Sequence, residues 1–418
     1  MAITPQDREI LRTLAAQVRT ITELPEMHIR RQRWYDHNDL TPQRPMILCF
    51  PEGAWSEILP RDQACQCTDP LLRSWEWTLR SKLFWWNHLR DDHVLTPFFD
   101  IPWAVSKGDF GVDVPYEHGA NRGSFVWQAP LKNFPEDIAK LKFRALSVER
   151  EKTHQQLELA TSLFGDLLTP RIRGSYWWTM GMTIELIRLV GLEQLMVLMC
   201  DQPEAVHQLM AFLRDEHLHF LNWFEKEGLL SSMNGPNYTG SGGVGFTRQL
   251  PGNPDETAFT PMKLRDLWGF SESQETVGIS PDMFGEFIFP YQLPLLEKFG
   301  LNCYGCCEPV HARIGYIEQI PRLRRVSVSP WADQQIMADR LYKKAVFSRK
   351  PNPTLVCAPT FDEALIREDI RQTLNIAGQC SLEIIMKDTH TVHHDYKRLT
   401  RWIEIGLEEV ERYMNDRK

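Results

Sequence analysis

The sequence contains no run of 18 apolar residues, so it predicts no membrane-spanning helix. It also has no excess of basic residues, because 47 Lys and Arg stand against 55 Asp and Glu and give a formal net charge of -8. That balance argues against nucleic acid as the main partner, since phosphate binding requires a basic surface. Low-complexity segments and fixed-period repeats are absent as well.

The chain shows no sign of a disulfide framework or of a targeting segment. Its nine cysteines follow no regular spacing. The N-terminal residues MAITPQDREI lack the charged-then-apolar pattern of a signal peptide. We therefore expect a cytoplasmic protein whose thiols are reduced.

Short apolar segments that end in polar residues alternate with helical patterns along most of the chain. This alternation is typical of a parallel sheet covered by helices, and about eight such units fit a barrel. We expect an α/β fold, a (β/α)8 TIM barrel over residues 41–418, preceded by an N-terminal helical arm over residues 1–40. Residues 107–135 have no period and are rich in Gly, Asp, Asn and Pro. Such a long loop in a compact domain tends to be functional.

The segment that carries most chemistry is Leu301–His311, LNCYGCCEPVH. Apolar residues at helical spacing over residues 284–300 end at a glycine, which predicts a helix followed by a strand. In an α/β barrel the carboxyl ends of the strands face the active site, so we expect Cys306, Cys307 and Glu308 there.

Three interpretations of these thiols are open. The spacing of Cys303 and Cys306 allows redox chemistry, although a thioredoxin-type pair lies at a helix start early in a small domain. Cys303 can equally be a small core residue. Thiolates with a carboxylate or imidazole nearby suit zinc, and three protein ligands with an open fourth position are typical of a catalytic zinc site.

The glycine-rich stretch GSGGVG at residues 240–245 does not have the GxGxxG spacing of a dinucleotide-binding loop. A flexible loop over a ligand is the better interpretation. Tryptophan and phenylalanine are plentiful, with 14 and 21 residues, and part of this excess is expected to line a pocket for a flat apolar ligand.

Two stretches of the sequence resemble the uroporphyrinogen decarboxylase superfamily, in which decarboxylases share a TIM barrel with cobalamin-dependent methyltransferases. The first is GFSESQETVGISPDMFGEFIFPYQLPLLEKFGLNCYGCCEP at residues 269–309. The second is GSYWWTMGMTIELIRLVGLEQLMVLMCDQPEAVHQL at residues 174–209, which is similar to the family's third-strand region. The resemblance covers most of the chain from about residue 40.

Departures from the family patterns favour the methyltransferase branch. The decarboxylases end their first strand in an arginine-rich loop that holds substrate carboxylates, whereas this chain has CFPEGAWSEIL at residues 49–59. The methyltransferases carry a His-x-Cys zinc motif, whose matching positions here are Tyr304 and Cys306. The resemblance therefore implies a mixed zinc ligand set, with the candidates Cys306, Cys307, Glu308, Glu272, Asp388 and His390.

The activity that the resemblance implies is an O-demethylase methyltransferase. Such an enzyme moves a methyl group from an O-methyl donor, most plausibly an aryl methyl ether, to the cobalt of a corrinoid protein. Zinc withdraws electrons from the ether oxygen, and Lys387 or Tyr304 could donate a proton to it. Trp177, Trp178 and Trp331 fall at expected strand ends and could stack on the arene, although packing under a loop is an equal alternative.

Other readings of the same fold stay open. A methyltransferase that acts on a small thiol such as coenzyme M would use zinc to activate the acceptor. A cofactor-free decarboxylase would need cationic substrate clamps, and a corrinoid-binding module would need no open zinc position. The chain lacks an Asp-x-His-x-x-Gly corrinoid motif, so we expect the corrinoid on a partner protein. The sequence does not decide whether the chain forms a homodimer.

Overall fold

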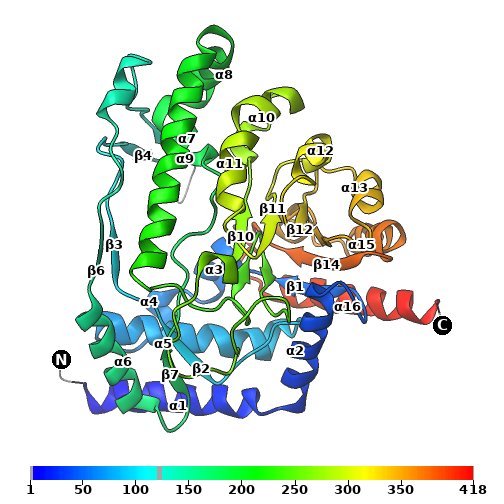
Figure 1. Cartoon of the computed structure of the whole chain (residues 1–418). Helices are drawn as coiled ribbons and strands as arrows, with labels where there is room; N and C mark the ends of the chain where they lie inside the picture. Colours follow the sequence, from blue (N-terminus) through cyan, green and yellow to red (C-terminus); the bar gives the residue numbers. More distant parts are fainter. Residues whose placement is uncertain (1–2, 120–124, 418) are drawn as a thin grey trace.

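A computed structural model describes residues 3–119 and 125–417 of the chain. Its centre is a parallel six-stranded sheet in the order β1-β14-β13-β12-β11-β10, in which every neighbouring pair is parallel (Figure 1). The strands are β10 (Trp268–Ser271), β11 (Leu301–Tyr304), β12 (Leu323–Val328), β13 (Val346–Arg349), β14 (Ser381–Met386) and β1 (Met46–Cys49).

Two more parallel strands, β2 (Phe98–Ile101) and β7 (Thr169–Ile172), pair with each other. The segment after β7 reaches the main sheet, where the Met180 amide donates to the Phe270 carbonyl at 2.8 Å. The expected α/β class is confirmed, and the parallel sheet is compatible with a barrel. Within the described residues, ladder hydrogen bonds join six strands and a separate pair, so they trace no closed barrel.

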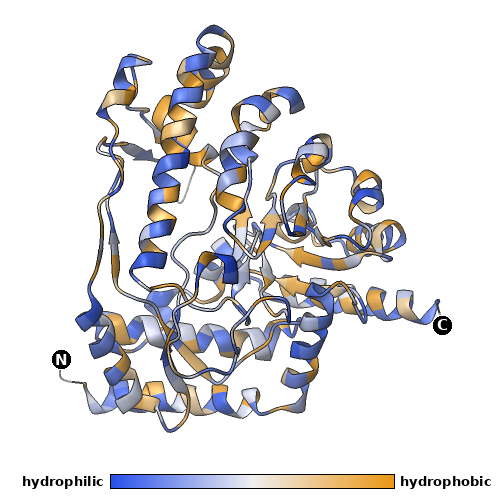
Figure 2. Ribbon diagram, in the orientation of Figure 1, coloured by the Kyte–Doolittle hydropathy of each residue, from blue (hydrophilic) through white to orange (hydrophobic). Residues whose placement is uncertain are grey.

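Helices cover the sheet between its strands. Figure 2 shows apolar residues along the strands, and one face of α16 is buried through residues such as Leu399, Trp402 and Ile403. The longer helices that follow the N-terminal pair are α5 (Pro70–Phe84), α6 (Arg150–Phe164), α7 (Thr183–Val190), α8 (Leu192–Asp201), α9 (Pro203–Lys226), α10 (Pro281–Phe287), α11 (Phe289–Leu296), α13 (Gln334–Leu341), α15 (Glu363–Ala377) and α16 (Lys397–Asn415). One-turn helices are α3 (Trp55–Ile58), α4 (Arg61–Ala64), α12 (Ile314–Ile317) and α14 (Thr354–Cys357). None of the helices in residues 3–119 and 125–417 is both long enough and apolar enough to cross a membrane.

The expected N-terminal helices form as α1 (Pro5–Thr22) and α2 (Pro25–Asn38). The side chain of Thr4 caps α1 by accepting from the Asp7 amide at 3.0 Å, which satisfies one free amide of the first turn. The apolar face of α1 packs on α5 and α6, with Leu11 and Val18 fully buried. This helix is therefore part of the packed body.

Residues 107–148 differ from the sequence-based expectation. Instead of a long loop without regular structure, the protein has short antiparallel pairs, β3 (Val105–Lys107) with β6 (Leu146–Val148) and β4 (Tyr116–His118) with β5 (Phe125–Trp127). A 3-10 turn spans Glu136–Lys140, and the next α-helix begins at Arg150, after residues 146–148, which their pairing with β3 holds extended. Part of the expected functional loop, residues 120–124, lies outside the described residues.

Candidate active site

The two adjacent thiols lie at a sharp turn after β11. Gly305 adopts a φ of 88°, and a Cβ added there would lie 2.9 Å from a methyl group of Val310. Only glycine fits this left-handed, crowded position without strain. The turn leaves Cys306 and Cys307 directly beyond the carboxyl end of β11, as the sequence predicts.

Two thiols and a carboxylate form a row at this end of the sheet. The Sγ atoms of Cys306 and Cys307 are 3.5 Å apart. The Cys307 thiol also donates to Oδ2 of Asp388 at 3.4 Å. Asp388 follows the last strand, β14, and adopts a φ of 56°, while its amide donates to Glu52 at 2.7 Å. The fold thus brings together three of the predicted residues from positions 81 residues apart in the chain. We call Cys306, Cys307 and Asp388 the thiol-carboxylate cluster.

Lys387 places a buried positive charge beside the cluster. Its Nζ donates to the Ser241 hydroxyl at 3.2 Å and to Sγ of Cys306 at 3.6 Å. Burial lowers the pKa of Lys387, but Tyr238, Cys306 and Asp388 outweigh it, and the net pKa is raised. The lysine is therefore a cation at neutral pH.

The same surroundings favour a thiolate at Cys306. The contact with the Cys307 sulfur lowers the pKa of Cys306, burial opposes that change, and the charge of Lys387 lowers the pKa further. Ser241 also donates to the sulfur, at 3.3 Å. Low-pKa thiols next to a cation are those that act as nucleophiles or metal ligands.

Two buried carboxylates hold the ends of β10 and β11. Glu308 accepts from the Cys306 amide at 2.8 Å and from the Ser273 amide at 2.9 Å, so it fixes the thiol turn to the neighbouring strand. Glu272 accepts from the Gln274 amide at 3.0 Å and from the Thr179 hydroxyl at 3.4 Å. Burial, with the charges of Glu275 and Glu308, raises the pKa of Glu272 well above its usual range.

The thiol-carboxylate cluster has spacings suited to zinc. Ligand atoms bound to one tetrahedral zinc lie about 3.5–3.8 Å apart when Zn–S is about 2.3 Å and Zn–O about 2.0 Å. The two measured separations, 3.5 and 3.4 Å, are close to these edges. Among residues 3–119 and 125–417, however, no group of three or more His, Cys, Asp or Glu side chains surrounds a common point. Glu272 and Glu308 are the other predicted carboxylates at this end of the sheet, and Glu308 already accepts from the Cys306 amide.

An aromatic cavity of about 440 Å³ adjoins the cluster. Its wall includes Trp268 and Phe270 of β10, which pack in the same apolar group as Cys306. Trp178 is 43% exposed and its ring lies 5.4 Å from that of Phe270. The cavity is lined by Ser175, Tyr176, Trp177, Trp178, Met233, Asn237, Tyr238, Gly240, Trp268 and Phe270. Its shape and lining suit a flat apolar ligand.

No protein-family model matches this chain, and a search of curated proteins found no match. The family resemblance of residues 174–209 and 269–309 therefore depends on the sequence motifs alone.

The structure corrects the predicted role of Tyr304 as a proton donor. Side chains alternate along a strand, so Tyr304 points away from the side that Cys303 faces. It is fully buried, and its hydroxyl donates to Oε1 of Gln292 at 2.8 Å. Tyr304 thus packs between the sheet and α11, outside the cavity.

Two other predicted residues lie apart from the cluster. Trp331 is 66% exposed and lines neither the aromatic cavity nor the cavity on the other side of Trp178, so its stacking on a substrate stays a prediction. His390 is exposed beside Gly53, and within the described residues its ring makes no hydrogen bond to either thiol. Asp388, two residues earlier, adopts a left-handed φ of 56°.

Sequence reasoning missed Ser241 and Glu52. Ser241 lies in the hairpin of β8 (Tyr238–Thr239) and β9 (Gly243–Val244), and it contacts residues 65 and 146 positions away in the chain. The sequence signal that could have found Ser241 was the glycine-rich pattern of residues 240–245, which indicated a loop over a ligand. Glu52 follows β1, and only the fold brings it to the Asp388 amide.

Proposed function

We propose that this protein is a zinc-dependent methyltransferase that moves a methyl group from an aryl methyl ether to the cobalt of a corrinoid carried by a separate protein. The observation that carries the proposal is the thiol-carboxylate cluster, which adjoins an aromatic cavity at the carboxyl ends of β11 and β14. The motifs that resemble the methyltransferase branch supply the reaction type.

The reaction needs a group that stabilises the leaving oxygen. The carbon–oxygen bond breaks, its electron pair stays on the phenolic oxygen, and the reduced cobalt supplies the pair that binds the methyl carbon. Cys306, Cys307 and Asp388 would hold the zinc, with Glu272 as a further candidate. When bound, zinc acts as a Lewis acid that stabilises negative charge on oxygen. Stabilisation that grows as the phenolate forms raises the rate, whereas equal binding of the intact ether would not.

The residues of this chain have separate tasks in the proposed reaction. Lys387 is a buried cation that donates to Cys306, so it can keep that sulfur ionised, and its positive charge can stabilise the developing phenolate. Trp178 and Phe270 hold the arene by stacking, and the apolar walls exclude water. Glu308 anchors the turn that presents both thiols.

The proposal includes a closed eight-stranded barrel. β2 and β7 form a parallel pair, and the Met180 amide joins the segment after β7 to β10. On the other side, the Asp92 amide donates to the Ile47 carbonyl of β1 at 3.0 Å, just before β2. Hydrogen bonds thus connect the six-stranded sheet to the segments next to the β2–β7 pair at both of its edges. Active sites of such barrels lie at the carboxyl ends of the strands, where the cluster is found.

Metal analysis and a methyl-transfer assay test this function. We expect wild-type protein to bind one equivalent of zinc and to demethylate at least one member of a methoxyarene panel in the presence of reduced corrinoid protein. Cys306→Ala should lose zinc and at least about 100-fold of the activity, because two thiolates provide the strongest ligands.

Cys200→Ala is the matched control, because Cys200 is an exposed thiol on α8. It should retain both zinc and activity. A full zinc equivalent in Cys306→Ala, or transfer that is unchanged by chelators, would contradict the proposed site. Transfer to coenzyme M instead of from a methoxyarene would assign the same site to the thiol methyltransferase.

A further inference from the structure

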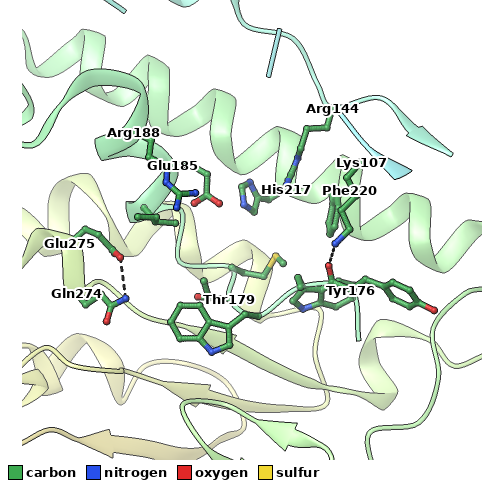
Figure 3. Close-up of a pocket in the computed structure, with 14 residues that line it drawn as sticks. Lys107, Arg144, Tyr176, Thr179, Glu185, Arg188, His217, Phe220, Gln274 and Glu275 are labelled. Carbon is green, nitrogen blue, oxygen red and sulfur yellow. Dashed lines mark hydrogen bonds between the residues drawn. The ribbon is translucent and has the colours of Figure 1, made fainter. Parts of the chain in front are cut away.

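A second cavity, of about 450 Å³, lies on the other side of Trp178 (Figure 3). Its walls come from the segment after β7, from α7 and α9, and from residues beside β3 and β6. Unlike the aromatic cavity, it is lined by several charged groups. The lining residues are Lys107, Arg144, Tyr176, Trp177, Trp178, Thr179, Met180, Ile184, Glu185, Arg188, His217, Phe220, Gln274 and Glu275. We call it the charged cavity.

Some of the lining charges are already bonded within the protein. Arg144 donates through Nε and Nη2 to Glu216, at 2.7 and 2.6 Å. Glu275 accepts from the Thr183 hydroxyl at 2.6 Å and from the Gln274 amide at 3.1 Å. These groups shape the wall and have protein partners, so they do not by themselves call for a ligand.

Glu185 and Arg188 of α7 differ in this respect. Oε2 of Glu185 and Nε of Arg188 are both buried and have no hydrogen-bond partner within the part of the chain that the structure describes. Both residues are half-buried, so only these two atoms are cut off from solvent, and each lacks the partner that a buried polar atom normally has. One cavity therefore contains an unused acceptor and an unused donor of opposite charge.

The two side chains do not satisfy each other. Residues three apart on a helix are neighbours and commonly pair when their charges are opposite. Here no ion pair of 4.0 Å or less joins them among the described residues, and Figure 3 shows both beside the cavity. Glu185 and Arg188 can therefore each bind a different charged group of one ligand.

The rest of the lining fits an aromatic body next to such charges. Trp177, Trp178 and Phe220 contribute apolar walls. Lys107 donates to the Tyr176 carbonyl while its ammonium lies 5.6 Å from the centre of the Phe220 ring. A positive charge is thus available near the aromatic wall, in addition to that of Arg188.

We propose that the charged cavity binds a small zwitterion with an aromatic side chain, of the α-amino acid class. The ligand carboxylate pairs with Arg188, the ammonium pairs with Glu185 on the same helix, and the ring packs on the aromatic wall formed by Trp177, Trp178 and Phe220. The two cavities share Tyr176, Trp177 and Trp178, but Glu185 and Arg188 line the charged cavity alone and have no part in the proposed methyl transfer, so the two proposals can fail separately.

Isothermal titration calorimetry with three matched probes tests the proposal on the full-length protein. L-phenylalanine has both charges, 3-phenylpropionate lacks the ammonium, and phenethylamine lacks the carboxylate. We expect L-phenylalanine to bind at least about tenfold more tightly than either single-charge probe, because each loses one charge-assisted contact. No binding of L-phenylalanine at millimolar concentration, or equal affinity for all three probes, would overturn the proposal.

Two variants assign the charges. Glu185→Gln should weaken L-phenylalanine binding about tenfold and leave 3-phenylpropionate unchanged, while Arg188→Gln should weaken L-phenylalanine and leave phenethylamine unchanged. Glu193→Gln, an exposed position on α8, is the matched control and should change nothing. Circular dichroism melting curves confirm that each variant folds. A uniform loss for every probe in both variants would contradict the assignment of one charge to each residue.

Discussion

The strands β11 to β14 carry buried charged groups in two places, midway along the strands and at their carboxyl ends. The two sets differ in how closely their groups are paired with protein partners. Midway along the strands, Glu383 of β14 is surrounded by partners: Nε of Arg325 lies 2.9 Å from one of its oxygens, His37 of α2 lies 3.1 Å from the other, and Ser348 also donates to the carboxylate. We call these four residues the internal ion network. At the carboxyl ends, the thiol-carboxylate cluster has long, soft contacts of 3.3–3.6 Å.

The electrostatics of the two sets differ in the same way. Burial raises the pKa of Glu383, but Arg325 and His37 outweigh it and lower the pKa to about 2, so this carboxylate is stable as an anion. Glu272 near the thiols shows the reverse, because burial and the carboxylates of Glu275 and Glu308 raise its pKa. The internal ion network therefore stabilises the fold, whereas the cluster holds charge that a bound cation would stabilise.

Breaking the internal ion network should give the largest effect. In Glu383→Gln, Arg325 remains buried without its counter-charge. Loss of one partner of a buried ion pair costs about 3–5 kcal/mol of unfolding free energy. Urea unfolding followed by circular dichroism measures the change. Glu411→Gln, at an exposed position on α16, is the control and should stay within about 0.5 kcal/mol of wild type. Equal stability of the two variants would show that the network is not what stabilises this part of the strands.

The contribution of Glu383 should also depend on pH. Its pKa is about 2 in the folded protein, below the unfolded value of about 4.3, so its stabilisation is complete above that value and disappears as the pH falls toward 2. The shift corresponds to about 3 kcal/mol at neutral pH. We expect the difference in unfolding free energy between wild type and Glu383→Gln to shrink between pH 5 and pH 3. A difference that stays constant over this range would exclude the titration of Glu383 as its source.

Lys387→Met tests the cluster without removing a proposed ligand. We expect the methyl-transfer rate to fall by roughly 100-fold, because the variant loses the buried positive charge that stabilises the developing phenolate, while zinc content stays at one equivalent. Lys343→Met, an exposed lysine, is the matched control. Zinc loss in Lys387→Met would instead indicate that the lysine supports metal binding, and an unchanged rate would remove it from the reaction.

The smallest expected effect is a difference in KM between variants of two exposed tryptophans, Trp178 and Trp331. Trp178→Ala should raise the KM for the methoxyarene roughly tenfold, since it removes a stacking contact of the aromatic cavity. Trp331→Ala should leave both KM and kcat unchanged, because Trp331 lines neither the aromatic cavity nor the charged cavity. Steady-state kinetics with the same substrate compares them. Similar KM changes in both variants would contradict the placement of the substrate.

Local patterns predicted the strands and the position of the thiols. β11 and its turn follow from an apolar run and a glycine, and the N-terminal helices follow from their apolar spacing and proline starts. The buried contact of Tyr304 with Gln292 was not predicted, because the residue types do not show which face of β11 is covered by α11. The pairing of β3 with β6 was not predicted either, because it joins residues 105–107 to residues 146–148 and no local pattern indicates it.

Long-range contacts set the limit for the rest of the site. Ser241 and Glu52 reach the cluster through contacts that span 65 to 336 residues of chain. The internal ion network joins α2 to β14 over 346 residues, and no spacing in the sequence indicates it. Whether His390 or Asp388 faces the thiols is decided by the left-handed backbone of Asp388, which the residue types alone do not fix.

Zinc K-edge X-ray absorption spectroscopy of the zinc-loaded protein tests the central claim most directly. We predict two Zn–S distances of about 2.3 Å in wild type, with oxygen or nitrogen in the remaining positions, and a single Zn–S distance in Cys306→Ala if any metal is retained. A zinc shell without sulfur, or the same two sulfur ligands in Cys306→Ala, would contradict a metal site formed by Cys306 and Cys307.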